Sequence, residues 1–289
     1  MNTLKKLLGK RVHLADSMVV VGIFLAFLYW GLESFLNVLS PEEISFYRQI
    51  FGPNVSEIWM RLIVLCLFLI FGSHVQFTIS KRKEAEMDLI ESNKKLQNAR
   101  AATILGLAKL AEYRDEGTGT HLERIREYAK RLAEQMAENS RYKTIITQEY
   151  IEDIFQSSIL HDIGKVGIPD AILLKPGRLT DEEFEVIKRH AIMGGDAIGI
   201  IESRIKERSF LSMGKEIAYN HHEKWDGSGY PRGLKGEEIP MSARIVALAD
   251  VYDALTSKRF YKEAYTHERS KKIIVDSKGS HFDPAIVEA

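Results

Sequence analysis

Two long apolar runs dominate the pattern of hydrophobic and polar positions near the start of the chain. Residues 17–32 carry no charge, the apolar character continues to about residue 39, and residues 62–80 form a second uncharged run. Each run is long enough to cross a bilayer as a helix, so the pattern predicts transmembrane helices at about 14–39 and 59–80. A signal peptide is the alternative for the first run and a buried soluble helix for the second, but no small-residue cleavage site follows the first apolar core.

The charges that flank these runs are distributed unequally. The segment between the runs is mainly acidic, whereas basic residues precede the first run and follow the second: Lys5, Lys6, Lys10, Arg11, Lys81, Arg82 and Lys83. Basic flanks remain on the cytoplasmic side of a membrane. We therefore predict a two-pass membrane anchor, residues 1–80, with both of its ends in the cytoplasm and lipid as a partner.

Residues 81–113 form a charged, proline-free and helix-prone segment. Small and larger side chains recur at alternating steps of four and three, along the seam Ala85, Leu89, Ser92, Leu96, Ala99, Thr103, Gly106 and Leu110. This spacing is typical of a short, imperfect coiled coil, in which small side chains let two helices approach closely. The segment is predicted to be a signalling helix of a homodimer; the alternative is a monomer in which it packs on the following domain.

The chain from about residue 100 to residue 289 has helical rather than strand periodicity. His121 begins an amphipathic helix that continues through Ile125, and a Thr-x-x-Glu capping box at 180–183 opens the helix that carries His190. A polar break at 138–150 precedes a helix from about residue 151. We predict an all-α fold: a helical bundle with long functional loops, preceded by the transmembrane helical hairpin and the signalling helix.

Composition limits the classes of function. A length of 289 residues and 45% hydrophobic residues suffice for one domain with an accessory segment. A net charge of zero argues against a DNA-binding or RNA-binding protein held by bulk charge. The single cysteine, Cys66, excludes an intramolecular disulfide framework.

Histidine and aspartate gather in the second half of the chain, in the order His161-Asp162, His190, His221-His222 and Asp250, with His121 upstream. Imidazoles and carboxylates without thiolates suit Fe, Mn or Zn. Adjacent ligands can serve neighbouring ions, and a carboxylate can bridge them. Two such ions clamp the attacking and leaving oxygens of a phosphodiester and supply hydroxide, while Lys165, one helical turn after His161, can neutralise phosphate charge. Separate structural histidines are the alternative, but the ordered pairs favour a two-ion phosphohydrolase.

Longer motifs carry a specific resemblance. HDIGKVGIPDAILLKPGRLTDEEF, HHEKWDGSGYPRGLKGEEIP, ARIVALADVYDALTSKRFYK and GSHFDP follow one another in this order. Over about residues 100–289 the chain resembles the HD-GYP family of cyclic di-GMP phosphodiesterases, a branch of the HD superfamily. The resemblance implies a hydrolase in bacterial second-messenger signalling. Together with the predicted two-pass anchor, it predicts a protein of the inner membrane with its catalytic domain in the cytoplasm, where signalling proteins are possible partners.

The family pattern also assigns residues. It implies metal ligands at His121, His161, Asp162, His190, His221, His222 and Asp250. It implies catalytic roles for Asp162 and Lys165, and substrate contacts from Lys165, Tyr230, Arg259 and Lys262. Two divalent ions per chain are expected, Fe or Mn before Zn. A catalytically weak cyclic di-GMP receptor or scaffold with the same fold is the alternative function, and an intact ligand set favours the enzyme.

One departure from the family concerns the number of ions. Family members with three metals carry a glutamate four residues before the first histidine ligand, where this chain has Gly117. We therefore expect a two-metal site and linear pGpG as the product, with slow or absent conversion to GMP. Glu116 as a substitute ligand is the rival hypothesis.

Overall fold

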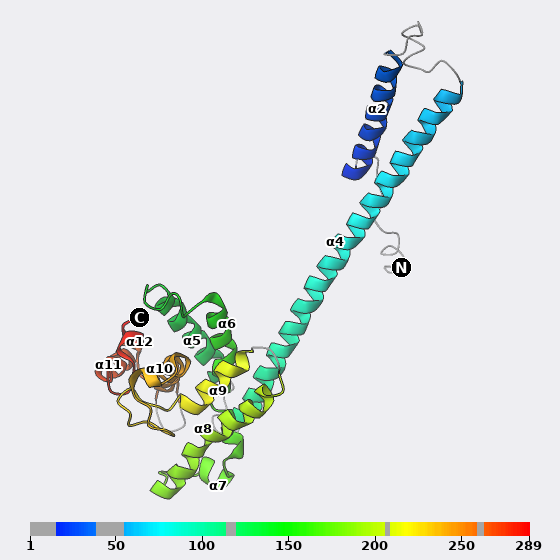
Figure 1. Cartoon of the computed structure of the whole chain (residues 1–289). Coiled ribbons are helices and arrows are strands. Elements are labelled where there is room, and N and C mark those ends of the chain that lie inside the picture. The colour runs from blue at the N-terminus through cyan, green and yellow to red at the C-terminus, as the bar shows by residue number, and fades with distance from the viewer. Residues whose placement is uncertain (1–15, 39–54, 114–119, 206–208, 259–262) are drawn as a thin grey trace. The chain divides into compact units, whose positions relative to one another are not determined.

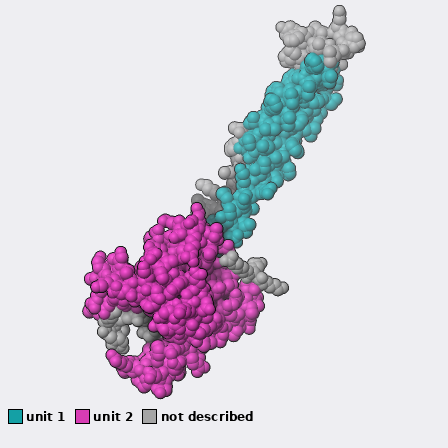
Figure 2. Space-filling view, turned by 60° about the vertical axis from the view of Figure 1, so that its left-hand side comes forward, with its two compact units in different colours: residues 1–97 teal, residues 98–289 magenta. Residues whose placement is uncertain are grey.

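The computed structural model describes residues 16–38, 55–113, 120–205, 209–258 and 263–289. Within these ranges the chain is helical and has no strand, apart from an isolated bridge between Lys278 and Phe282 (Figure 1). The predicted all-α fold is confirmed. The chain divides into two compact units, residues 1–97 and residues 98–289, which Figure 2 colours separately.

The first unit contains α2 (Ser17–Val38) and most of α4 (Val55–Glu112). Both helices are long and apolar enough to cross a membrane by length and composition. The second apolar run and the charged segment after it form one uninterrupted helix, because residues 55–112 contain no proline to break it. The change in composition near residue 81 therefore does not end a helix.

The second unit is a bundle. Its helices of ten residues or more are α5 (His121–Ala137), α6 (Gln148–Ser157), α8 (Asp181–Glu202), α9 (Phe210–Asn220), α10 (Met241–Thr256) and α11 (His267–Asp276). Shorter elements complete it: the helices α7 (Asp170–Leu173) and α12 (Pro284–Glu288), with the 3₁₀ turns η1 (Ser158–Leu160), η2 (Ile163–Gly167) and η3 (Gly236–Glu238).

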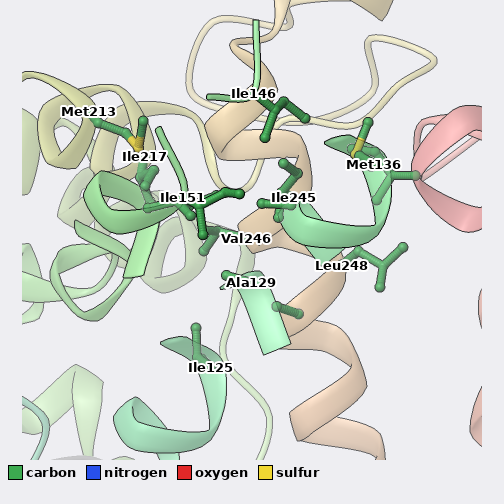
Figure 3. Packing of buried hydrophobic residues seen from close by; sticks show 14 of the residues in the cluster. Ile125, Ala129, Met136, Ile146, Ile151, Met213, Ile217, Ile245, Val246 and Leu248 are labelled. Carbon is green, nitrogen blue, oxygen red and sulfur yellow. The ribbon is translucent and has the colours of Figure 1, made fainter. Parts of the chain in front are cut away.

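The hydrophobic core of this bundle lies among α5, α6, α9 and α10 (Figure 3). Ile125, Ile217 and Ile245 are fully buried in it. A second cluster includes Ala108 from the last turns of α4 and Leu122 from the first turn of α5. These two clusters hold together helices that carry or flank the predicted metal ligands.

The helix before His161 differs in detail from the prediction. It begins at Gln148 rather than near residue 151, and His161 and Asp162 lie beyond its end, between η1 and η2. Gly164 explains the tight geometry that follows, because a Cβ atom there would lie 2.0 Å from the carbonyl oxygen of His190. Only glycine lets η2 approach α8 this closely, which brings Asp162 to His190.

Candidate metal centre

One group of potential ligands joins Asp162, His190, His221 and His222. His190 projects from α8, and His221 and His222 follow the last turn of α9. Each side chain offers one ligand atom, and these atoms all lie within 4.8 Å of one another. His190 Nε2 lies 3.2 Å from Asp162 Oδ1 and 3.5 Å from His221 Nε2. Three imidazoles and one carboxylate thus converge on a single point.

A second group joins His121, His161 and Asp250. His121 begins α5, His161 follows η1, and Asp250 lies in α10. The Nε2 atom of His121 is 3.6 Å from Asp250 Oδ1. His121 and His161 are buried, and they meet edge to face with ring centroids 5.7 Å apart. Among the residues that the structure describes, these two groups include all seven predicted metal ligands.

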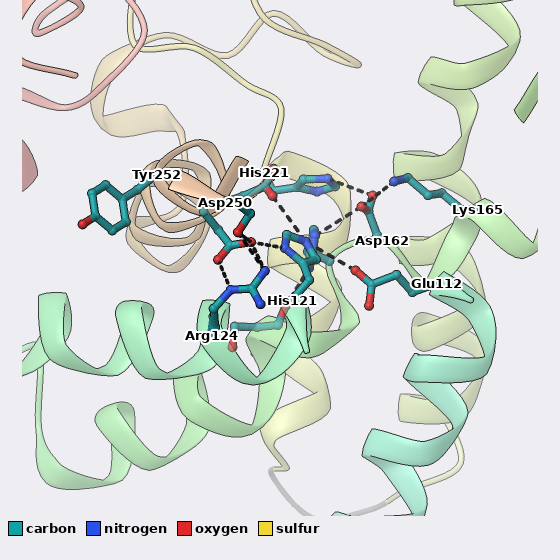
Figure 4. Close-up of polar contacts among 12 residues, drawn as sticks. Glu112, His121, Arg124, Asp162, Lys165, His221, Asp250 and Tyr252 are labelled. Carbon is teal, nitrogen blue, oxygen red and sulfur yellow. Dashed lines mark hydrogen bonds and ion pairs between the residues drawn. The ribbon is translucent and has the colours of Figure 1, made fainter. Parts of the chain in front are cut away.

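Asp162 lies between the two groups. Its Oδ1 atom faces His190 and His221, whereas its Oδ2 atom is 3.2 Å from His161 Nε2 and 2.9 Å from Lys165 Nζ (Figure 4). One oxygen therefore points toward each group. This is the arrangement that a carboxylate bridging two ions requires.

The histidines are oriented by contacts on the other side of each ring. The Nδ1 atoms of His161, His190 and His221 lie 2.9 Å from Ser158 O, 2.7 Å from Ile187 O and 3.1 Å from Ile217 O. A carbonyl only accepts, so each Nδ1 donates its proton, and the Nε2 of each ring in its neutral form keeps a lone pair directed into the site. The 3.5 Å contact between Nε2 of His190 and Nε2 of His221 is then not a hydrogen bond, and it fits two ligands of one cation.

The electrostatics of the site favour bound cations. Burial lowers the pKa of His221 and lowers that of His222 well below its ordinary value, which keeps both rings neutral and able to act as ligands. For His161 burial also lowers the pKa, but the Asp162 and Asp250 carboxylates outweigh it and raise the pKa to about 9. Burial opposes ionisation of Asp162, yet Lys165 and His161 hold its pKa well below its ordinary value. Asp162 therefore stays ionised and is able to act as a ligand.

Two supporting residues were not predicted from the sequence. Asp253 accepts from His121 Nδ1 at 2.6 Å and binds the Arg124 guanidinium, whose Nε donates at 2.5 Å. Glu112, the last residue of α4, is buried, and its Oε1 atom lies 3.4 Å from His121 Nε2 (Figure 4). Asp253 could have been found from its position one turn after Asp250 on the same helix. No spacing rule connects Glu112 to His121.

The glycine-rich loop packs against this site. The buried carboxylate of Glu223 accepts from the backbone N–H groups of Arg232 and Leu234, at 2.7 and 3.1 Å, which fixes the path of the loop. A Cβ atom at Gly229 would lie 2.3 Å from the backbone nitrogen of Lys224, so glycine is required there. The Tyr230 ring stacks on the His222 ring with centroids 4.7 Å apart.

The structure describes two of the four residues predicted to contact the substrate, Lys165 and Tyr230. Lys165 contacts Asp162, and Tyr230 lies beside His190 and His222 of the first ligand group. Arg259 and Lys262 lie outside the described residues, as do Glu116 and Gly117. The hypotheses about direct phosphate contacts and about the missing glutamate therefore remain predictions.

The donor set fits divalent metal ions: imidazole nitrogens and carboxylate oxygens converge in two adjacent groups, and half-buried Asp162 is shared between them. An all-helical bundle around such residues defines a protein with a candidate dinuclear metal centre. The chain belongs to the HD domain family, whose family model matches residues 84–286.

Several bacterial proteins are similar to this region. A cyclic di-GMP phosphodiesterase of Vibrio cholerae is 53% identical over 204 residues, which are 70% of this chain and 42% of that protein. A cyclic di-GMP phosphodiesterase of Thermotoga maritima is 45% identical over 63% of this chain and 46% of its own length. A 3'3'-cGAMP-specific phosphodiesterase of Vibrio cholerae is 41% identical over 70% of this chain and 35% of its own length. The chain thus spans less than half the length of each of these relatives.

Proposed function

We propose that this chain is a metal-dependent phosphodiesterase that opens cyclic di-GMP to linear pGpG. The observation that carries the proposal is the position of Asp162, which presents one oxygen to each ligand group and has the Lys165 ammonium 2.9 Å away. The relatives named as cyclic di-GMP phosphodiesterases support this substrate. The relative that acts on 3'3'-cGAMP makes that dinucleotide the right comparison substrate.

Each residue has a distinct task in this proposal. His190, His221 and His222 would hold one ion, His121, His161 and Asp250 the other, and Asp162 both. When bound, such ions polarise a phosphodiester and activate water at neutral pH. The Lys165 ammonium neutralises charge on the phosphate, Asp253 and Arg124 fix the orientation of His121, and Tyr230 closes one side of the site. Arg259 and Lys262 are proposed to contact the substrate.

The nature and number of the ions are part of the proposal. Nitrogen and oxygen donors without thiolate favour Fe or Mn, and also accept Zn. Two ions suffice for one in-line cleavage, so we propose that hydrolysis stops mainly at linear pGpG.

The proposal is tested by Asp162→Ala. Loss of the shared carboxylate is expected to reduce cyclic di-GMP hydrolysis roughly 10³-fold or more and to lower the bound metal, because both ions lose a ligand. Lys165→Ala is expected to reduce turnover about 10²–10³-fold with the metal retained. The measurements are chromatography of the products and metal analysis of anaerobically purified protein.

Asp276→Ala is the matched control, since Asp276 is an exposed carboxylate of α11. Both dinucleotides are assayed in parallel. Wild-type turnover by the Asp162 variant after metal removal and reloading would refute the assignment. Faster hydrolysis of 3'3'-cGAMP than of cyclic di-GMP would refute the proposed substrate.

We also propose that residues 1–80 anchor the protein in the bacterial inner membrane, that residues 81–113 are a helical linker, and that residues 100–289 form a cytoplasmic catalytic domain. The most apolar 18-residue stretch of each helix, α2 and α4, has a mean hydropathy of 2.0 and 2.2, respectively, and few residues of either stretch are buried. The basic residues after the second run, Lys81, Arg82 and Lys83, support cytoplasmic ends.

The proposed partner along the linker is a second copy of the chain. The seam leucines Leu89, Leu96 and Leu110 have relative exposures of 61%, 69% and 69%. Apolar side chains at coiled-coil spacing gain stability when a second helix covers them. The homodimer and the membrane location are both tested by predictions in the Discussion.

A further inference from the structure

Three side chains form a small aromatic surface beside the metal centre. The Tyr230 ring stacks on the His222 ring with centroids 4.7 Å apart, and Phe184 meets Tyr230 edge to face with centroids 6.1 Å apart. The Lys188 ammonium lies 5.1 Å from the Phe184 centroid and 5.7 Å from the Tyr230 centroid. These three residues, Phe184, Lys188 and Tyr230, are called the aromatic platform. Through His222 the platform is continuous with the first ligand group.

The platform is accessible, and a stable helix end supports it. Phe184 is 43% exposed and lies in the first turn of α8, which the capping box of Thr180 and Glu183 stabilises. Lys188 lies one turn later on the same side of this helix. Its ion-pair partner, Glu185, has a side chain that is 68% exposed, and such a pair contributes little to stability. The ammonium can therefore turn toward another partner.

A nucleobase matches this combination of aromatic rings and an ammonium group. Aromatic rings stack on any base, so stacking contributes affinity without choosing between bases. Guanine presents two acceptors along one edge, N7 and O6, whereas adenine presents the N7 acceptor and an amino donor. An ammonium group only donates hydrogen bonds. Lys188 therefore favours guanine, because on adenine one of its donors would meet another donor.

We propose that the aromatic platform binds one guanine of the dinucleotide, which stacks on Phe184 and accepts hydrogen bonds from Lys188 at O6 and N7. This inference rests on the proposed function, since it deepens the recognition of the same substrate. Phe184 is then a binding residue, and Lys188 determines specificity. Because the contact with His222 fixes the platform beside the metal centre, the base that it holds selects which of the two phosphodiesters faces the ions.

The first test measures affinity without turnover. Metal-loaded protein is titrated calorimetrically with hydrolysis-resistant phosphorothioate analogues of cyclic di-GMP and cyclic di-AMP, and the wild type should prefer the guanine analogue. Phe184→Ala should weaken the binding of both analogues at least ~5-fold, because either base loses its stacking partner. Lys188→Gln should lower the preference for the guanine analogue at least ~5-fold, because a glutamine amide also pairs with adenine.

Conservative variants and matched controls separate recognition from damage. Phe184→Tyr keeps the ring and Lys188→Arg keeps donors for guanine, so both should bind as the wild type does. Ile200→Ala removes a side chain that is 60% exposed on α8, 16 residues after Phe184. Arg189→Gln removes the exposed cation next to Lys188, which points about 100° away on the helix. Both controls should bind as the wild type does, and every variant should keep its metal content.

The second test uses the two unequal phosphodiesters of 3'3'-cGAMP. Hydrolysis gives pGpA or pApG, depending on which bond faces the ions. If the platform holds the guanine, the wild type should form one linear product in at least ~5-fold excess, and Lys188→Gln should form the two in similar amounts. Chromatography against synthetic standards distinguishes the products.

Unchanged affinities in Phe184→Ala, or an unchanged guanine preference in Lys188→Gln, would overturn the proposal. So would equal amounts of the two linear products from the wild type. If binding of the analogues depends on the platform but no dinucleotide is hydrolysed, the proposed function fails and the platform assignment stands. If cyclic di-GMP is hydrolysed while both platform variants bind as the wild type does, the platform assignment fails and the proposed function stands.

Discussion

The two units of the chain place the same kinds of side chain in opposite environments. In the second unit Ile125, Ile217 and Ile245 are fully buried, and charged groups lie mainly outside or in the metal centre. In the first unit Phe24 and Ile70 are 64% and 67% exposed. The second unit has apolar residues in a compact core, whereas many apolar side chains of the first unit face outward.

The first unit also has a charged side chain in its interior. Arg61 is 8% exposed, and its guanidinium donates to Glu33 at 3.0 Å. Gly22 and Gly72 lie where α2 and α4 touch, since a Cβ atom at either would be 2.6 or 2.5 Å from a carbonyl oxygen of the other helix. Close backbone contact through small residues and paired internal charges are how helices associate in lipid.

The largest expected effect concerns the location of the protein in the cell. If lipid covers the outward apolar residues, the full chain should remain in the membrane fraction after a high-salt wash, and a fragment beginning at Lys81 should be soluble. The physical reason is the removal of about 20 apolar residues per helix from water. A reporter fused after Ala289 should be active in the cytoplasm. A periplasmic reporter, or a full-length chain in the soluble fraction, would contradict the proposed topology.

A smaller effect is expected for dimerisation, in which a second copy of the chain is proposed to cover the exposed seam leucines of residues 81–113. Leu89 and Ile90 are neighbours with nearly equal exposures, 61% and 62%, but only Leu89 lies on the predicted seam. In the soluble fragment, Leu89→Lys should weaken dimerisation at least ~10-fold, because burying one leucine contributes about 1.5–3 kcal/mol. Ile90→Lys is the control and should leave the association constant unchanged.

Sedimentation equilibrium over a range of protein concentrations measures both variants. A monomeric wild-type fragment, or equal weakening by the two substitutions, would contradict a coiled coil in this register. The apolar stripe would then need a different partner.

The sequence predicted some parts of this molecule better than others. The all-α fold followed from helical periodicity, and the seven candidate ligands followed from histidine–aspartate motifs that keep their order along the chain and from the family pattern that they resemble. The sequence pattern did not show that α4 continues as one helix past Lys81. A change from apolar to charged side chains changes the environment around a helix, but it does not interrupt the backbone hydrogen bonds that propagate it.

Tertiary contacts explain the remaining differences. Glu112 and His121 belong to different helices, so their proximity depends on how Ala108 and Leu122 pack in the second hydrophobic cluster. Likewise, the 3₁₀ turns around His161 depend on the contact between Gly164 and the backbone of α8. Neither contact has a period or a spacing that a single sequence reveals.

The smallest expected effect concerns α8 of the second unit, whose first turn is stabilised by a capping box. The Thr180 hydroxyl accepts from the backbone N–H of Glu183 at 3.3 Å, and the Glu183 carboxylate accepts from the backbone N–H of Thr180 at 2.8 Å. Thr180→Ala should lower the free energy of unfolding by about 1 kcal/mol, measured by urea denaturation. Metal content should not change, because His190 lies nearly three turns further along α8.

Glu183 adds a dependence on pH to this cap. Hydrogen bonds from the Lys175 ammonium and from the Thr180 backbone lower its pKa below the ordinary value of 4.5. A carboxyl whose pKa is lower in the folded state stabilises that state above its unfolded pKa, and this contribution disappears as the pH falls through the folded pKa. The stability difference between wild type and Glu183→Gln should therefore be full at pH 6 and should shrink as the pH is lowered below about 4.5. A difference that stays constant down to pH 3 would show that the cap acts through shape alone, without the charge of Glu183.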